Sequence, residues 1–123
     1  MPSMTNTTNT EDTLNIDVAF GGRKSIVTSK NFKGGFVSTA FGGAEINLMQ
    51  ADSIETMYLD LKVSFGGVEI IVPSHWEVQI EVNPSFGSVE DHRMIRTASA
   101  GEDKRTLVLR GSCAFGSIEI KSY

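Results

Sequence analysis

Apolar and polar residues alternate along most of the chain, and the alternation changes phase wherever a phenylalanine is followed by glycine. Ahead of Phe65, Leu61 and Val63 occupy every second position, which is the pattern of a β-strand with one buried face. Beyond the glycines, the apolar residues Val68 and Ile70 stand at even-numbered positions, so the alternation has shifted by one residue and has the opposite parity. Because a slip of one residue would turn every later side chain to the other face, the glycines must absorb the shift at a bulge or sharp corner. Phe65 continues the first alternation, so its ring is predicted to be buried at that corner.

The same unit, Phe-Gly-Gly or Phe-Gly-Ser, occurs five times at intervals of 21, 24, 21 and 29 residues. The copies begin at Phe20, Phe41, Phe65, Phe86 and Phe115. A period in the twenties is typical of one coil of a solenoid. The sequence therefore predicts an all-β, single-domain fold, a short β-solenoid (β-helix-like) of about four to five stacked rungs. Each rung would hold three short strands joined by corners, with the phenylalanine rings in one internal column and Ile46, Ile70 and Ile120 in another.

The rest of the chain is interpreted around this repeat. Residues 1–13 are polar and low in complexity, and they are predicted to form a flexible linker ahead of a solenoid domain at 14–123. A second glycine corner is expected at 32–35, and Trp76, at a comparable place in a later rung, is expected to be a core or corner residue. The fourth unit departs from the pattern over 91–106, which we interpret as a projecting loop that is either functional or a tolerated insertion.

Composition and charge narrow the possible partners. The net charge of −4 and the pI of about 5.1 do not favour nucleic acid or an anionic membrane surface. The single cysteine, Cys113, has no partner for an internal disulfide and is interpreted as a buried, unreactive thiol. No apolar run reaches the roughly 18 residues of a membrane span, and the N-terminus lacks the features of a signal peptide. The chain as given is expected to be soluble, with membrane attachment only through a segment outside it.

Alignment of the repeat units places one cation and four carboxylates at the same outward position. These residues are Lys24, Glu45, Glu69, Glu90 and Glu119. Stacked carboxylates repel one another by about 1 kcal/mol per adjacent pair in water, and by less in salt. We favour a solvated face relieved by Lys24 and by Lys62 or Lys121 over a cation-binding or partner-binding stripe. A single column of carboxylates rarely supplies the roughly six to eight oxygen ligands that calcium takes.

The sequence lacks recognisable catalytic motifs. His75 and His92 do not combine with Cys113 at any zinc-binding spacing. It contains neither a Gly-x-Ser-x-Gly nucleophile elbow nor a phosphate-binding glycine loop followed by a helix. We therefore predict that the protein is not an enzyme and has no catalytic, cofactor-binding or metal-binding residues.

Three segments together resemble the C-terminal domain of the LiaF-like, cell wall-active antibiotics response protein family. They are Phe-Gly-Gly-Ala-Glu-Ile-Asn-Leu at 41–48, Phe-Gly-Gly-Val-Glu-Ile-Ile-Val-Pro at 65–73 followed by Trp76, and Phe-Gly-Ser-Ile-Glu-Ile at 115–120. The match covers nearly all of residues 14–123 and departs at 91–103. The resemblance implies a β-solenoid without catalytic residues that usually follows a membrane-embedded helical segment. It also implies a bacterial protein that restrains a sensor histidine kinase in envelope-stress (cell-wall antibiotic) two-component signalling.

Two functions follow as expectations. The first is a non-enzymatic regulatory domain of a protein associated with the bacterial cytoplasmic membrane, acting on a protein partner such as a sensor histidine kinase. The alternative is a self-assembling structural scaffold that resembles the bactofilins. Its motivation is that the chain stops soon after Phe115, so that the last rung would present an open strand edge for further pairing. Either the 91–106 excursion or a second copy, in a homo-oligomer joined through the solenoid ends, would then cover that edge.

Overall fold

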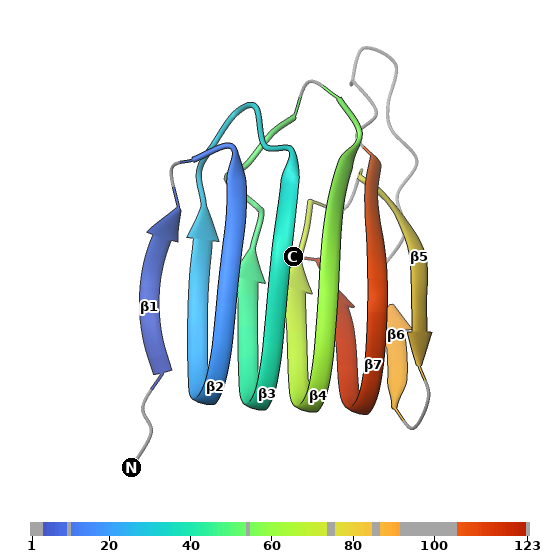
Figure 1. Cartoon of the computed structure of the whole chain (residues 1–123). Coiled ribbons are helices and arrows are strands. Elements are labelled where there is room, and N and C mark those ends of the chain that lie inside the picture. The colour runs from blue at the N-terminus through green and yellow to red at the C-terminus, as the bar shows by residue number, and fades with distance from the viewer. Residues whose placement is uncertain are drawn as a thin grey trace.

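The computed structural model describes residues 4–9, 11–53, 55–73, 76–84, 87–91 and 106–122, and these residues contain no helix. Their strands are β1 (Met4–Asn9), β2 (Thr13–Val27), β3 (Gly34–Asn47), β4 (Met57–Ile71), β5 (Glu77–Pro84), β6 (Ser88–Asp91) and β7 (Thr106–Lys121). All neighbouring strands are parallel, in the order β1-β2-β3-β4-β7-β5, and β6 also pairs with β7 (Figure 1). The predicted all-β class and the parallel, β-helix-like arrangement are confirmed.

The four longest strands, β2, β3, β4 and β7, each fold back on themselves at their Phe-Gly unit (Figure 1). Residues before the phenylalanine form a first arm and residues after it form a second arm. First arms pair with first arms and second arms with second arms, so the sheet has two facing layers with the core between them. β5 pairs with the first arm of β7 and β6 with its second arm. β5 and β6 are therefore the two arms of one further bent unit.

The bend depends on glycine because neighbouring strands approach closely there. Gly66 has a φ of 135°, and a Cβ at this position would overlap the carbonyl oxygen of Gly42 in the adjacent strand. The next position is less crowded, since a Cβ on Gly67 would lie 3.4 Å from the Ser117 carbonyl oxygen. This difference explains why Ser88 and Ser117 replace the second glycine in later copies.

The predicted change of parity at the glycines is confirmed, but the predicted burial of the phenylalanine rings is wrong. In β4, Leu61 and Val63 are buried before the bend and Val68 and Ile70 after it, whereas Phe65 is exposed. The exposed fractions are 77% for Phe20, 51% for Phe41, 45% for Phe65 and 49% for Phe115. The two arms converge at the bend (Figure 1), where the nearest buried side chains of β4 are those of Val63 and Val68, which are smaller than phenylalanine. The ring therefore occupies the convex side. Phe86 lies outside the described residues.

Equivalent inward side chains of successive strands form continuous columns in the core. Ile46, Ile70 and Ile120 are register partners across β3, β4 and β7, and all three are fully buried. The predicted isoleucine column is confirmed. Because parallel register pairing places like side chains on like, each added rung extends the same columns.

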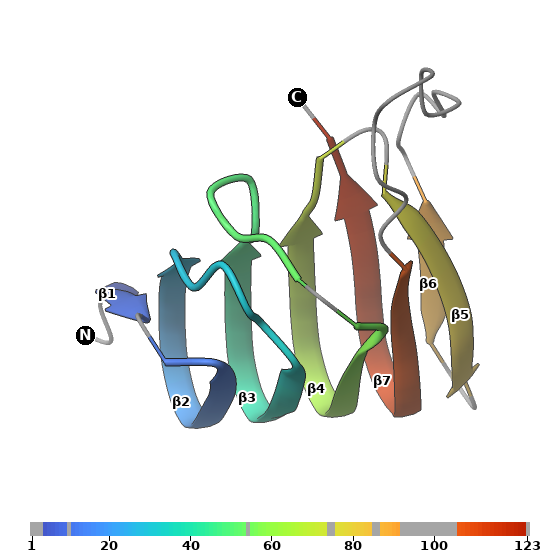
Figure 2. The same cartoon turned by 90° about the horizontal axis from the view of Figure 1, so that it is seen from above.

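In the described residues, the third side of the rungs is not a strand, which corrects the prediction of three short strands. The described residues of 28–33, 48–56 and 72–76 link the second arm of one rung to the first arm of the next without regular structure (Figure 2). Hydrogen bonds nevertheless join these links from rung to rung. The Phe32 amide donates to the Asp52 carbonyl oxygen at 2.9 Å, and the Asp52 amide donates to the Ser29 carbonyl oxygen at 3.0 Å. Phe32 and Trp76 are buried on this side, as expected for Trp76, and Gly34 and Gly35 open β3 at the predicted second corner.

The stacking order of the rungs differs from their order in the sequence. β7 pairs with β4 on one side and with β5 and β6 on the other, so the last unit lies inside the stack. The open edge predicted after Phe115 is therefore occupied by β5 and β6. The 29-residue interval before Phe115 supplies the chain length that β7 needs to pass the rung of β5 and β6 and lie beside β4. Of the 91–106 excursion, residues 92–105 lie outside the described residues.

The N-terminal segment also differs from expectation. Residues 4–9, within the predicted flexible linker, form β1 and pair with the second arm of β2 from Met4↔Gly22 to Asn9↔Val27. Parallel pairing engages only backbone groups, so a polar Thr/Asn sequence without an apolar alternation can form such a strand.

Candidate interaction surfaces

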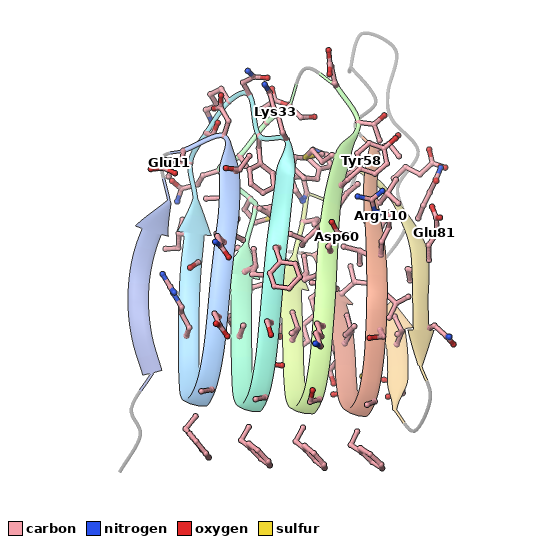
Figure 3. All side chains as sticks on the ribbon, in the orientation of Figure 1. Glu11, Lys33, Tyr58, Asp60, Glu81 and Arg110 are labelled. Carbon is pink, nitrogen blue, oxygen red and sulfur yellow. The ribbon has the colours of Figure 1, made fainter. Side chains whose placement is uncertain are left out.

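The bends carry a ladder of stacked aromatic rings on the outside of the molecule. Phe20, Phe41, Phe65 and Phe115 are register partners, and we call these four side chains the aromatic ladder. Successive ring centroids are 5.4, 5.0 and 5.1 Å apart, with interplanar angles of 9°, 1° and 6°. Figure 3 shows a row of side chains projecting beyond the bends. The ring faces cover one another, so the ladder presents mainly ring edges to the solvent.

Small uncharged residues flank the aromatic ladder on both sides. In the chain, alanine or serine precedes each ring and glycine follows it. The next outward position on the second arms holds Gly22, Gly43, Gly67 and Ser117, which are register partners. The nearest outward charged side chains on the second arms are therefore one row further away.

That further row contains the charged residues predicted to align. Register pairs join Lys24, Glu45, Glu69, Glu119 and Glu90 in that order, and we call these five side chains the carboxylate row. The predicted alignment is confirmed, with Glu119 and Glu90 exchanged because β7 lies between β4 and β6. The aromatic ladder and the carboxylate row thus run side by side along the stack, separated by the row of glycines.

Lysines neutralise part of the carboxylate row, as the favoured interpretation requires. Lys24 Nζ lies 3.1 Å from Glu45 Oε2, and Lys121 Nζ lies 2.6 Å from Glu69 Oε1 and 3.8 Å from Glu119 Oε2. The hydrogen bond from Lys121, followed by one with the Glu45 carboxyl, lowers the pKa of Glu69 below 4.5. Lys62, the other proposed counter-charge, lies in the first-arm layer between Ser38 and Ser112.

A shallow open groove follows the glycine row between these two features. Its volume is about 360 Å³. It is lined by Gly43, Ala44, Glu45, Gly67, Val68, Glu69, Ser117, Glu119 and Lys121. With half-exposed carboxylates and Lys121 along one side and glycine backbone as its floor, the groove is accessible to solvent and shows no enclosed reaction centre.

A second exposed cluster lies on the outer face of the first arms. Arg110 Nε and Nη2 donate to the two carboxylate oxygens of Asp60 at 3.1 and 3.3 Å, and the guanidinium carbon lies 4.7 Å from the centroid of the Tyr58 ring. Phe36 is the register partner of Asp60, and Glu81 that of Arg110. Figure 3 shows Tyr58, Asp60, Arg110 and Glu81 together on this face. We call Phe36, Tyr58, Asp60 and Arg110 the aromatic–arginine patch.

This patch was not predicted from the sequence, although a signal for it was present. Phe36, Asp60, Glu81 and Arg110 each stand five positions before the phenylalanine of their repeat unit. Alignment of the units at that position would have placed them in one row. The cation–π contact is harder to predict, because Tyr58 belongs to a neighbouring row.

The remaining residues singled out from the sequence form no additional site among the described residues. Cys113 is fully buried, and burial raises the pKa of its thiol despite a hydrogen bond with the Ser88 backbone, in agreement with an unreactive core cysteine. His75, His92 and the excursion at 92–105 lie outside the described residues. Within the described ranges, no three His, Cys, Asp or Glu side chains form a group able to hold a metal ion. The same part of the chain contains no helix long and apolar enough to cross a membrane.

Comparison with known proteins gives one structural neighbour. No model of a known protein family matches the sequence, and no curated protein matches it. The chain is similar to the crystal structure of a proposed cell adhesion protein from Clostridium sporogenes, with a TM-score of 0.71 and 16% sequence identity. The similarity covers 90% of this chain and 55% of the other, so this chain spans about half the length of that neighbour. At this identity, the similarity establishes the fold alone.

Proposed function

We propose that this chain is a non-enzymatic protein-interaction domain that regulates a partner at the bacterial cytoplasmic membrane. The observation that carries the proposal is the aromatic–arginine patch, a preorganised and exposed set of side chains on a rigid sheet. Tyrosine and arginine are, with tryptophan, the residue types enriched among side chains that dominate binding energy at protein interfaces. Arg110 is held by Asp60 and Tyr58 before any partner arrives, which lowers the entropy lost on binding.

The partner in this proposal is a sensor histidine kinase of an envelope-stress (cell-wall antibiotic) signalling system. The support for this partner is the resemblance of residues 41–48, 65–76 and 115–120 to the LiaF-like domain. In the same proposal, the solenoid has five rungs: those of β2, β3, β4 and β7, and the divided rung of β5 and β6. A flat face built from five parallel first arms offers a regular surface for a partner helix or sheet.

The experiment compares capture of membrane proteins by wild-type chain and by two patch variants. We expect the wild-type chain to retain a histidine kinase from detergent-solubilised native membranes, and Tyr58→Ala and Arg110→Ala each to retain at least about tenfold less. Asp17→Asn serves as the matched control, because Asp17 is exposed on the outer face of the same layer in β2. Recovery of no kinase by the wild-type chain, or equal recovery by all variants, would contradict the proposal.

The second candidate is the bactofilin-like scaffold, and the observation that favours it is that the described sheet has a terminal strand in each layer at both ends. At one end these are β1 and the first arm of β2, and at the other β5 and β6. The two ends do not match, however. β1 extends the second-arm layer by one strand beyond the first arm of β2, so a second copy stacked on β1 would leave a one-strand gap beside Thr13–Val18. Light scattering that shows mass growing with concentration would favour the scaffold; a constant monomer mass would eliminate it.

A further inference from the structure

The aromatic ladder is the largest exposed apolar feature that the proposed function does not use. Four phenylalanines expose between 45% and 77% of their surface along one straight edge. At about 200 Å² for a phenylalanine, the exposed area is about 400 Å². Exposed apolar patches of this size on soluble domains commonly mark sites that contact a protein or a membrane.

The geometry of the rings excludes several kinds of occupant. Sugars and nucleobases bind aromatic side chains through ring faces, and here each inner ring has both faces covered by its neighbours at 5.0–5.4 Å. A second copy or another rigid protein would need a groove complementary to a convex ridge. An interface confined to about 400 Å² would also reach only half of the roughly 800 Å² per partner that stable protein complexes bury.

A lipid surface needs neither free ring faces nor a groove that is complementary to the ridge. The bends lie in one row, so all four rings can enter the same plane together (Figure 1). The residues on either side of the rings are alanine, serine or glycine, so entry of the ring edges does not force a charge into the apolar phase. The carboxylate row lies beyond the intervening glycine row and would remain at the level of the headgroups. We propose that the aromatic ladder is a membrane-contact edge that inserts into the interface of a phospholipid bilayer.

This inference departs from the sequence-based expectation that membrane attachment occurs only through a segment outside the chain, and it does not depend on the identity of the protein partner. The charges on the chain predict which phospholipids the aromatic ladder should prefer. Lys24 and Lys121 neutralise only part of the carboxylate row, and the whole chain has a charge of −4. Binding through the ladder is therefore apolar in origin. It should be stronger on zwitterionic than on anionic vesicles at low salt, and salt should reduce that difference.

The test places a tryptophan in the ladder and measures its depth in vesicles. Phe41→Trp introduces an indole among the exposed rings, while Trp76, the tryptophan already present, is buried and serves as the internal reference. Vesicles of phosphatidylcholine brominated along the acyl chains quench tryptophans that reach the interface. We expect marked quenching and a blue shift in Phe41→Trp, and no quenching of Trp76 in the wild-type chain. Absence of quenching in Phe41→Trp would overturn the inference.

A flotation assay with phosphatidylcholine vesicles supplies the matched comparison. The double variant Phe41→Ser with Phe65→Ser should lower vesicle binding by about tenfold or more, because two of the four apolar anchors are lost. Met49→Ser is the control, since Met49 is 36% exposed in the link that follows β3 and its loss should leave vesicle binding unchanged. Phe41→Leu removes the ring stack but keeps an apolar side chain, so it should retain most of the vesicle binding. This variant distinguishes loss of an apolar anchor from misfolding caused by loss of the ring stack.

Three results would contradict the membrane-contact edge. Equal vesicle binding by the wild-type chain and the double serine variant would show that the ladder only stabilises the bends. Loss of binding in Met49→Ser would place the contact on another face. A wild-type chain that is dimeric in solution, and that becomes monomeric in the double serine variant, would identify a second copy as the occupant of the ladder.

Discussion

At the scale of single residues, the two positions after each phenylalanine have different requirements. The first must be glycine, because its backbone has a positive φ in β4 and its Cβ would overlap a carbonyl oxygen of the neighbouring strand. The second tolerates a Cβ, and serine occupies it in the later units. The sequence predicted the corner and its change of parity from the alternation alone. It did not predict that the phenylalanine ring points outward, because side chains alternate between the inner and outer face only while the strand stays straight.

Gly66→Ala tests the first of these positions. The substitution forces a Cβ against the Gly42 carbonyl oxygen and a strained backbone conformation on alanine, so we expect a loss of about 3 kcal/mol or more in the free energy of unfolding. Gly67→Ser, the residue found at the equivalent position 117, should change it by less than about 1 kcal/mol. Chemical denaturation measures both. Equal effects of the two substitutions would contradict the assignment of the bend.

Thr39 presents the opposite case of a polar residue in an apolar column. It lies between Val18 and Val63 in the register, is 1% exposed, and its hydroxyl has no hydrogen-bond partner in the structure. Thr39→Val keeps the shape and removes the buried unsatisfied group, so we expect the chain to gain about 1 kcal/mol of stability. Thr39→Ser, which keeps the hydroxyl and removes a methyl group, should destabilise it. A less stable valine variant would show that the hydroxyl is satisfied in solution.

At the scale of elements, parallel in-register pairing converts a sequence repeat into rows on the surface. The carboxylate row could be predicted because every unit carries a charged residue four positions after its phenylalanine. The aromatic–arginine patch was missed because its row mixes aromatic, acidic and basic residues and shows no repeat by residue type. The sequence left open whether Lys62 or Lys121 neutralises the carboxylate row. The structure decides for Lys121, whose ammonium group contacts Glu69 across β4 and β7.

The pair of Lys121 and Glu69 predicts a measurable dependence of stability on pH. Since the folded pKa of Glu69 lies below 4.5, the stability it contributes is present above the unfolded pKa and is lost as pH falls through the folded value. Lys121→Met should reduce stability at neutral pH by about 0.5 kcal/mol or less, because the pair is partly exposed, and it should flatten the acid limb of the curve. Lys62→Met, in the other layer, should leave that limb unchanged. Identical acid limbs in wild type and Lys121→Met would refute this contribution of the pair.

At the scale of the whole molecule, the repeat predicted a stack of parallel rungs but not the order of the rungs. Periodicity fixes what each rung contains and carries no information on which rung it contacts. The 29-residue interval before Phe115 was the only numerical sign of a departure, and it was interpreted as an inserted loop. In the structure, that interval separates β6 from a strand that returns to lie between β4 and β5. The same return covers the edge of the last unit that motivated the scaffold hypothesis and makes β5 and β6 the terminal strands at that end of the described sheet.

The rung order and the outward stack of phenylalanines can be tested together by disulfide formation between positions 65 and 115. Adjacent parallel strands are about 4.8 Å apart, within the reach of a disulfide, whereas strands two rungs apart are separated by about 10 Å and are out of reach. The measurement uses Phe65→Cys with Phe115→Cys in a Cys113→Ala background, and Phe41→Cys with Phe115→Cys as the comparison pair. We expect rapid intramolecular oxidation of the 65–115 pair and none of the 41–115 pair. Failure of the 65–115 pair to close in a folded chain would contradict it, because rungs stacked in sequence order would place the fourth unit between those two positions.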